Sequence, residues 1–169
     1  MTSDARLVTH AVVDSPYGEL TLVARDGVLS GLYMTEQRHR PEPETFGERV
    51  SALEEPFAEV RRQLALYFAG ELTEFDVPVR LEGTEFQKSV WAQLLRIPYG
   101  ETWSYGELAE RLGNPKASRA VGLANGKNPI SIIVPCHRVI GSSGSMTGYG
   151  GGLARKERLL AFESGALTL

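Results

Sequence analysis

The strongest constraint on the fold is a change in the pattern of apolar residues near residue 84. Before it, three segments alternate apolar and polar residues: LVTHAVVD, GELTLVAR and VLSGLYM. The turn sequences SPYG and DG separate these segments, which predicts an antiparallel meander of strands. After it, helical spacing and helix-capping signals dominate. The chain of 169 residues is therefore expected to be an α+β protein of two small subdomains.

The predicted N-terminal subdomain, residues 1–83, combines this sheet with one helix. The helix is expected to begin at Pro56, because proline breaks the preceding segment, and to end at Gly70. The following ELTEFDVPVRLEG is typical of an extended connector. The apolar stripe of the helix consists of Phe57, Val60, Leu64 and Phe68.

Two capping boxes mark helix starts in the predicted C-terminal subdomain, residues 84–169. In such a box the first hydroxyl accepts from the fourth amide, while the fourth side chain reaches back. Thr84 and Gln87 form the first box, whose helix should run to about residue 96. Ser104 and Glu107 form the second, which opens a short helix.

The second of these helices is followed by the signals of a third. Gly113 ends the short helix, and Asn114 with Pro115 predicts an N-cap and a first helical position. The new helix is expected to run to Gly126. Two short helices joined by a tight turn predict a helix-turn-helix. We therefore expect a mostly helical, winged-helix-like subdomain.

Charge is distributed unevenly along the chain. Residues 1–84 have eight Lys or Arg against fifteen Asp or Glu, whereas residues 85–169 have ten against six. No acidic residue lies between Glu110 and Glu157. A local basic face can bind nucleic acid even when the net charge is −3. The basic residues of this window are Arg111, Lys116, Arg119, Lys127, Arg138, Arg155 and Lys156.

The third helix has almost no long side chains. Arg119 is its one long central side chain. Small residues allow close approach to a groove but offer few groups that read base edges, which predicts DNA binding with little sequence preference. The alternative is that they pack tightly on a neighbouring helix. The small residues are Ala117, Ala120, Gly122 and Ala124.

The single cysteine follows the apolar run ISIIV, which is consistent with a buried strand. One cysteine allows no internal disulfide, and no apolar run has transmembrane length, so we expect a reducing, cytoplasmic location and no membrane partner. In an extended backbone His137 would point away from Cys136, and a water would have to connect them. From composition alone, a lone cysteine after an apolar strand is more often an inert buried residue than a nucleophile.

A carboxylate near the C-terminus is a candidate partner for the histidine. LARKERLLAFE is predicted to be a terminal helix, and Glu163 shares the inward face of Leu159 and Leu160. A carboxylate on an apolar face needs a partner. Glu163 could orient His137 and stabilise its charged form, as the third group of a catalytic triad does.

Three motifs together resemble a known family. PCHRVIGSSGSMTGYGGGLARKERLL, RAVGLANGKNPI and PYGETWSYGELA closely resemble the O6-alkylguanine-DNA alkyltransferases, also called methylated-DNA–protein-cysteine methyltransferases. The resemblance is strong over residues 84–163. Over residues 1–83 it extends only to length and to the order of strands and helix.

The resemblance implies a reaction in which DNA is repaired by direct reversal of damage. Cys136 would accept a methyl or other alkyl group from O6 of guanine, or O4 of thymine, irreversibly and once per molecule. His137 would act as its base through a water, and Glu163 would orient His137. The implied protein needs no cofactor. Since residues 1–83 contain no cysteine, the structural zinc of some relatives is not expected either.

The resemblance also implies how damaged DNA is bound. A protein monomer, acting alone or cooperatively, would bind double-stranded DNA through the minor groove and turn the damaged nucleotide out. Arg119 would enter the base stack and Tyr105 would crowd the phosphate. The remaining implied residues are Asn128 at the hinge between the recognition helix and the active-site strand, Tyr149 and the amide of Gly150 near the guanine oxygen, and the carbonyls of Cys136 and Val139 as acceptors for the guanine amine.

Three other functions fit part of this pattern. A non-catalytic binder of alkylated DNA would lack the acceptor cysteine. A Cys-His hydrolase or acyltransferase would need an oxyanion hole and would leave the basic window unexplained. A helix-turn-helix regulator would make Cys136 silent. An alkyltransferase accounts for the cysteine, the basic window and the helix-turn-helix together.

Overall fold

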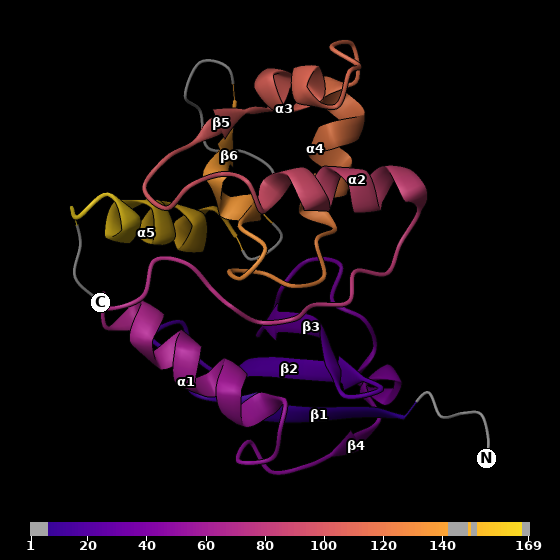
Figure 1. The fold of residues 1–169 in the computed structure, drawn as a ribbon, viewed down its shortest axis with the longest axis vertical. Helices are drawn as coiled ribbons and strands as arrows, with labels where there is room; N and C mark the ends of the chain where they lie inside the picture. Colours follow the sequence, from indigo (N-terminus) through magenta and orange to yellow (C-terminus); the bar gives the residue numbers. More distant parts are fainter. Residues whose placement is uncertain (1–6, 142–148, 150–151, 167–169) are drawn as a thin grey trace. The chain divides into compact units, whose positions relative to one another are not determined.

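The computed structural model describes residues 7–141, 149 and 152–166, and the chain divides into two compact units (Figure 1). Unit 1 takes in the described residues up to Arg80 apart from 37–39. Unit 2 takes in 37–39 and the described residues from Leu81 onward. Unit 1 contains a sheet and a helix and unit 2 is mostly helical, so the predicted α+β class is confirmed.

The sheet of unit 1 is the predicted antiparallel meander with one added strand. β1 (Val8–Val13) pairs with β2 (Leu20–Arg25), and β2 pairs with β3 (Val28–Met34). The fourth strand, β4 (Glu48–Arg49), runs parallel to β1 at the edge, which gives the order β3-β2-β1-β4. A two-residue strand has too little periodicity to be found from sequence.

One helix, α1 (Phe57–Phe68), lies beside this sheet (Figure 1). It follows Pro56, and Gly70 has a φ of 78°, so both predicted ends are confirmed. Phe57, Val60 and Leu64 are buried as the stripe predicts. Tyr67 is fully buried whereas Phe68 is only half-buried, so the inward face is rotated by one residue at the end of the helix.

The first helices of unit 2 begin at the two predicted capping boxes. Thr84 Oγ1 accepts from Gln87 N at 3.1 Å, and Thr84 N donates to Gln87 Oε1 at 3.0 Å. Ser104 and Glu107 make the equivalent pair at 3.0 and 2.9 Å. These bonds satisfy amides that a helix start leaves without partners. The elements concerned are α2 (Glu85–Leu94), β5 (Trp103–Ser104) and α3 (Tyr105–Arg111).

The helix-turn-helix is formed by α3 and α4 (Ser118–Gly126), which pack on each other. The predicted start of α4 was wrong. Asn114 does not cap it; instead Ala117 N donates to Asn114 O at 3.0 Å and closes a separate turn. The helix therefore begins at Ser118, one turn later than the asparagine–proline pair indicates.

The predicted strand over ISIIV was also wrong. Residues 131–134 form a buried turn and bend, and Ile132 has a φ of 72°. The Asn128 side chain supplies the hydrogen bonds that a neighbouring strand would give: its Oδ1 accepts from Ile130 N at 3.0 Å and its Nδ2 donates to Val134 O at 2.7 Å. A short apolar run cannot distinguish a buried strand from a buried loop.

After this loop the chain returns to regular structure. A single 3-10 turn, η3 (Cys136–Arg138), leads into β6 (Val139–Ile140), which pairs in parallel with β5. The predicted terminal helix is confirmed as α5 (Leu153–Glu163). Figure 1 shows α5 on the side of β5 and β6 away from α4.

Candidate active site

Cys136 opens the 3-10 turn and is buried, with 3% of its surface exposed. The sequence-based expectation of an extended backbone here was wrong, so strand alternation does not decide where His137 points. The ring of His137 is fully buried. The turn follows the loop that Asn128 holds, and this places a thiol and an imidazole at adjacent positions in the interior of unit 2.

Asn128 contacts the sulfur itself. Its Nδ2 lies 3.0 Å from Cys136 Sγ and donates to Val134 O on the same loop. Asn128 is 97% buried, so this amide has a fixed environment. The family resemblance implied a hinge at this residue and did not anticipate the contact with the sulfur. An amide donor at this distance stabilises negative charge on the sulfur.

Glu163 is shared by two neighbours of the cysteine. Its Oε2 accepts from His137 Nε2 at 2.8 Å. Arg138 holds both oxygens, with Nε 2.7 Å from Oε1 and Nη2 3.0 Å from Oε2, and its Nη1 donates to Ile97 O at 2.7 Å. All three side chains are buried. The predicted need of Glu163 for a partner is confirmed, and Arg138 is a partner that sequence reasoning missed.

These contacts determine the protonation states of Glu163 and His137. Burial opposes charge on Glu163, but the hydrogen bonds from His137 and Arg138 outweigh it and hold the pKa of Glu163 well below its usual range. Burial lowers the pKa of His137 despite the nearby carboxylate. A neutral ring beside an acceptor-only carboxylate carries its proton on Nε2. His137 Nδ1 then bears a lone pair, and it has no hydrogen-bond partner among the described residues.

The thiol is not ionised at rest. Burial raises the pKa of Cys136 to about 11, although the Asn128 amide and the charge of Lys156 act in the opposite direction. A thiol with this pKa needs a base before it can act as a nucleophile. The lone pair of His137 is the base that the surroundings supply.

Lys156, one of the basic residues between Glu110 and Glu157, is a buried cation. Its Nζ donates to Val139 O at 2.5 Å, and the side chain is fully buried. Burial lowers the pKa of Lys156 to about 8. Lys156 precedes Leu159 by three residues and Glu163 by seven, so helical spacing could have placed it on the inward face of α5.

Two backbone carbonyls of the site have side-chain donors. Val139 O accepts from Lys156, and Cys136 O accepts from Asn125 Nδ2 at 3.2 Å. A carbonyl oxygen has two lone pairs, and Cys136 O also accepts from the backbone N–H of Val139, so both of its lone pairs are in use. Asn125 is 99% buried. Together with Asn128 it fixes the position of Cys136 through both its carbonyl and its sulfur.

The residues expected to meet DNA lie on the helix-turn-helix. Arg119 is exposed on α4, and Tyr105 is half-buried at the start of α3. The Nζ of Lys156 lies 5.9 Å from the centre of the Tyr105 ring, which connects this tyrosine to the cysteine site. Tyr149 is buried. Gly150 lies outside the described residues.

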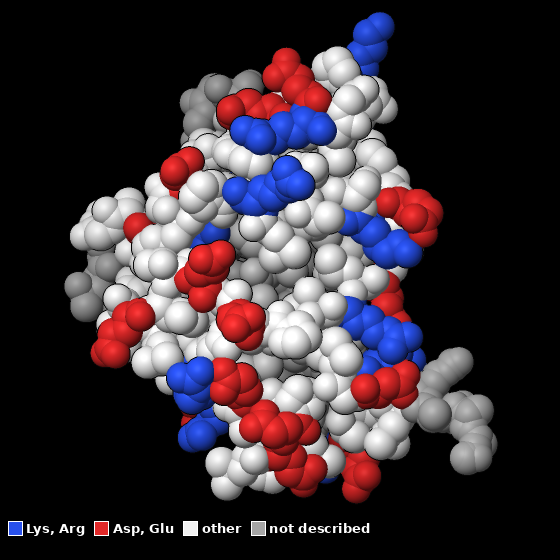
Figure 2. Space-filling view, in the orientation of Figure 1, with Lys and Arg blue, Asp and Glu red and all other residues white. Residues whose placement is uncertain are grey.

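The small residues of α4 are divided between two faces of the helix. On one face Val121 and Ala124 are buried, and a Cβ at Gly122 would lie 3.8 Å from the Tyr105 ring. This face packs within the unit. On the other face Arg119 and Ala120 are exposed. Figure 2 shows a Lys or Arg side chain projecting from the end where α3 and α4 meet.

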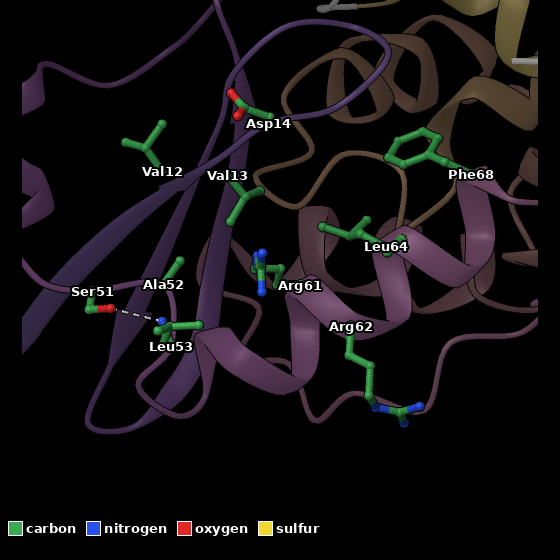
Figure 3. A pocket seen from close by; sticks show the side chains of 11 residues that line it. Val12, Val13, Asp14, Ser51, Ala52, Leu53, Arg61, Arg62, Leu64 and Phe68 are labelled. Atoms are coloured by element: carbon green, nitrogen blue, oxygen red, sulfur yellow. Dashed lines mark hydrogen bonds between the residues drawn. The ribbon is translucent and has the colours of Figure 1, made fainter.

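A separate pocket of about 670 Å³ lies in unit 1 between α1 and the loop after β4 (Figure 3). Val13 and Leu64 face it, whereas Arg62 extends away and pairs with Glu59 at 2.6 Å. The pocket contains no candidate site residue.

Among the described residues, no group of three or more His, Cys, Asp or Glu could hold a metal ion. No helix in the described part of the chain is long and apolar enough to cross a membrane.

Comparison with known proteins covers nearly the whole chain. The family model described as "6-O-methylguanine DNA methyltransferase, DNA binding domain" matches residues 85–165. A second model, described as "6-O-methylguanine DNA methyltransferase, ribonuclease-like domain", matches residues 8–81. A methylated-DNA–protein-cysteine methyltransferase of Mycolicibacterium paratuberculosis is 57% identical over 157 residues, 93% of each chain. The chain belongs to this methyltransferase family.

The chain is also similar to further methylated-DNA–protein-cysteine methyltransferases and to solved structures. That of Methanosarcina acetivorans is 54% identical over 155 residues, covering 91% of this chain and 97% of the relative. A crystal structure titled as Mycobacterium tuberculosis OGT in complex with DNA is 53% identical, covers 94% of each chain and has a TM-score of 0.85. The weak resemblance inferred for residues 1–83 was therefore an underestimate, because a segment without chemical motifs offers little to recognise.

Proposed function

We propose that this methyltransferase repairs DNA by accepting a methyl or other alkyl group on Cys136 from O6 of guanine or O4 of thymine. The observation that carries the proposal is the buried chain of contacts around the cysteine. Asn128 meets the sulfur, and Glu163 joins His137 to Arg138. Family membership supplies the reaction, and these contacts support the assignment of roles.

The first step in this proposal is removal of the thiol proton. A water between Cys136 Sγ and His137 Nδ1 passes the proton to the ring, and Glu163 stabilises the imidazolium that forms. The amide of Asn128 and the charge of Lys156 stabilise the thiolate. The need for a base follows from the raised pKa of the thiol.

The second step is displacement at the alkyl carbon. A bond forms between sulfur and carbon while the bond from carbon to the guanine oxygen breaks. The departing guanine takes up a proton from water, and the His137 imidazolium returns the thiol proton to water, so the protons balance. Hydrogen bonds to the departing guanine lower the barrier; Tyr149 and the amide of Gly150 are the proposed donors. A thioether is stable in water, so each molecule reacts once and needs no cofactor.

Binding of the substrate is assigned to the helix-turn-helix and the adjoining carbonyls. A monomer binds double-stranded DNA in the minor groove with little sequence preference, and Arg119 fills the stack when the nucleotide is flipped, which costs a few kcal/mol. Tyr105 crowds the phosphate, and the carbonyls of Cys136 and Val139 accept from the guanine amine. Residues 84–169 thus carry DNA binding and alkyl transfer, and residues 1–83 support them.

Mass spectrometry of the protein tests this proposal. After incubation with a duplex that contains O6-methylguanine, the Cys136 peptide should gain one methyl group, in an amount equal to the repaired base. The Cys136→Ser variant should bind the duplex without repairing it. An unmodified peptide beside unrepaired DNA would contradict the proposal, and repeated turnover would favour the hydrolase class.

A further inference from the structure

The outward face of α4 carries an exposed leucine. Leu123 is 65% exposed and lies four residues after Arg119, so one helical turn places both side chains on the same face. Isolated exposed leucines are common on protein surfaces. The position of this one is informative, because Ala120 between the two side chains is exposed as well and the helix contains no acidic residue.

The surroundings of Leu123 identify the chemistry of the partner. Lys116 and Lys127 are exposed just before and just after the helix, so the leucine lies within a basic surface. Basic side chains around an apolar contact fit a groove whose walls are phosphates and whose interior is sugar and base edges. The similar Mycobacterium tuberculosis OGT structure is a complex with DNA.

We propose that Leu123 is a direct DNA contact, which inserts its side chain into the minor groove one helical turn from Arg119. The inference rests on the proposed DNA repair function and adds a contact to it. An apolar side chain displaces water from the groove without neutralising a phosphate. Its contribution to affinity is therefore independent of salt, unlike that of a lysine or arginine.

Binding to an unmodified duplex, measured by fluorescence anisotropy over a range of salt concentrations, tests the inference. Leu123→Ala should weaken binding about tenfold, since most of a leucine side chain loses its buried contact. The slope of log affinity against log salt should equal that of the wild type. Leu123→Met should keep near wild-type affinity. Leu53→Ala is the matched control, since Leu53 is 74% exposed but lies in unit 1.

Several outcomes would overturn the inference. Unchanged affinity of Leu123→Ala, or an equal loss in Leu53→Ala, would show that the leucine does not touch DNA. A change in sedimentation of the DNA-free protein would assign Leu123 to a contact between copies of the chain. A lower methyl-transfer rate at saturating DNA with unchanged affinity would also contradict it.

The two proposals can fail separately. Absence of methyl transfer by the wild-type protein would contradict the repair function, whatever the binding data show. Normal methyl transfer with no effect of Leu123→Ala on affinity would contradict only the leucine contact. Because Leu123 is exposed, its truncation removes no core packing, and thermal unfolding of the variant should match the wild type.

Discussion

At the scale of single residues, the carboxylate of Glu163 decides which nitrogen of His137 carries the proton. The guanidinium of Arg138 pairs with the Glu163 carboxylate, and the imidazole of His137 donates a hydrogen bond to the same carboxylate. A buried carboxylate with one of these partners alone would be costly. The arrangement keeps Glu163 ionised, and an ionised Glu163 keeps the lone pair of His137 on the nitrogen that is available as a base.

We expect Glu163→Gln to lower the rate of methyl transfer about a hundred- to ten-thousandfold. Arg138 should hold the glutamine oxygen, which turns the amide nitrogen toward His137 and favours the tautomer with its proton on Nδ1. The base is then lost while the fold is largely kept. Single-turnover kinetics with a methylated duplex, beside circular dichroism of the variant, would measure both effects.

Glu157→Gln is the matched control for this change. Glu157 lies on the same helix but is exposed, so its substitution should leave the rate unchanged. A Glu163→Gln variant that transfers methyl at the wild-type rate would show that His137 does not depend on the carboxylate.

At the scale of elements, the edge of the unit 1 sheet depends on Gly47. This residue has a φ of 73° and precedes β4, and a Cβ at its position would lie 1.8 Å from Val8 O. The close approach lets β4 run beside β1. Gly27, in the turn between β2 and β3, has a similar φ of 79° but nothing within 4 Å of such a Cβ.

These two glycines separate backbone strain from collision. Gly27→Ala should cost about 1 kcal/mol in the free energy of unfolding, because alanine disfavours positive φ. Gly47→Ala adds a backbone collision and should cost about 3 kcal/mol or more. Urea unfolding followed by circular dichroism gives both values. Equal costs would show that β4 moves away without penalty.

Elements with strong local signals could be predicted from the sequence. Alternation gave β1, β2 and β3, and the capping boxes gave the starts of α2 and α3, because those signals lie within a few residues of the elements they define. The loop over 130–134 could not be predicted, since the Asn128 side chain replaces a strand partner. The contact of Arg138 with Glu163 joins residues 25 apart, and no periodicity connects them.

At the scale of the whole molecule, the buried ionisable groups make stability depend on pH. His137 and Glu163 both have pKa values below their ordinary values of 6.5 and 4.5. As pH falls below each ordinary value, the unfolded chain binds the proton before the folded one does. Their contributions to stability are therefore full above pH 6.5 and are lost as the pH falls.

We expect the free energy of unfolding of unit 2 to fall below about pH 6.5 and to fall more steeply below about pH 4.5, by up to about 1.4 kcal/mol per pH unit for each proton. The two tryptophans of the chain, Trp91 and Trp103, are both buried in unit 2. Their fluorescence during urea unfolding therefore reports on this unit.

Glu163→Gln serves as the control for the pH experiment. The variant should lose the steeper fall below about pH 4.5, because the group responsible no longer titrates. If the wild type and the variant lost stability in parallel down to pH 3, other groups would account for the acid sensitivity.

The left-handed turn at Ile132 has a consequence for how the loop before Cys136 tolerates change. A β-branched residue disfavours a φ of 72°, yet the Ile132 side chain is 99% buried. At position 132 the burial of the isoleucine side chain therefore offsets the cost of an unfavourable backbone conformation. If position 132 is randomised, the variants that still fold should fall into two classes. Glycine or asparagine would suit the positive φ, and aliphatic residues would fill the buried space.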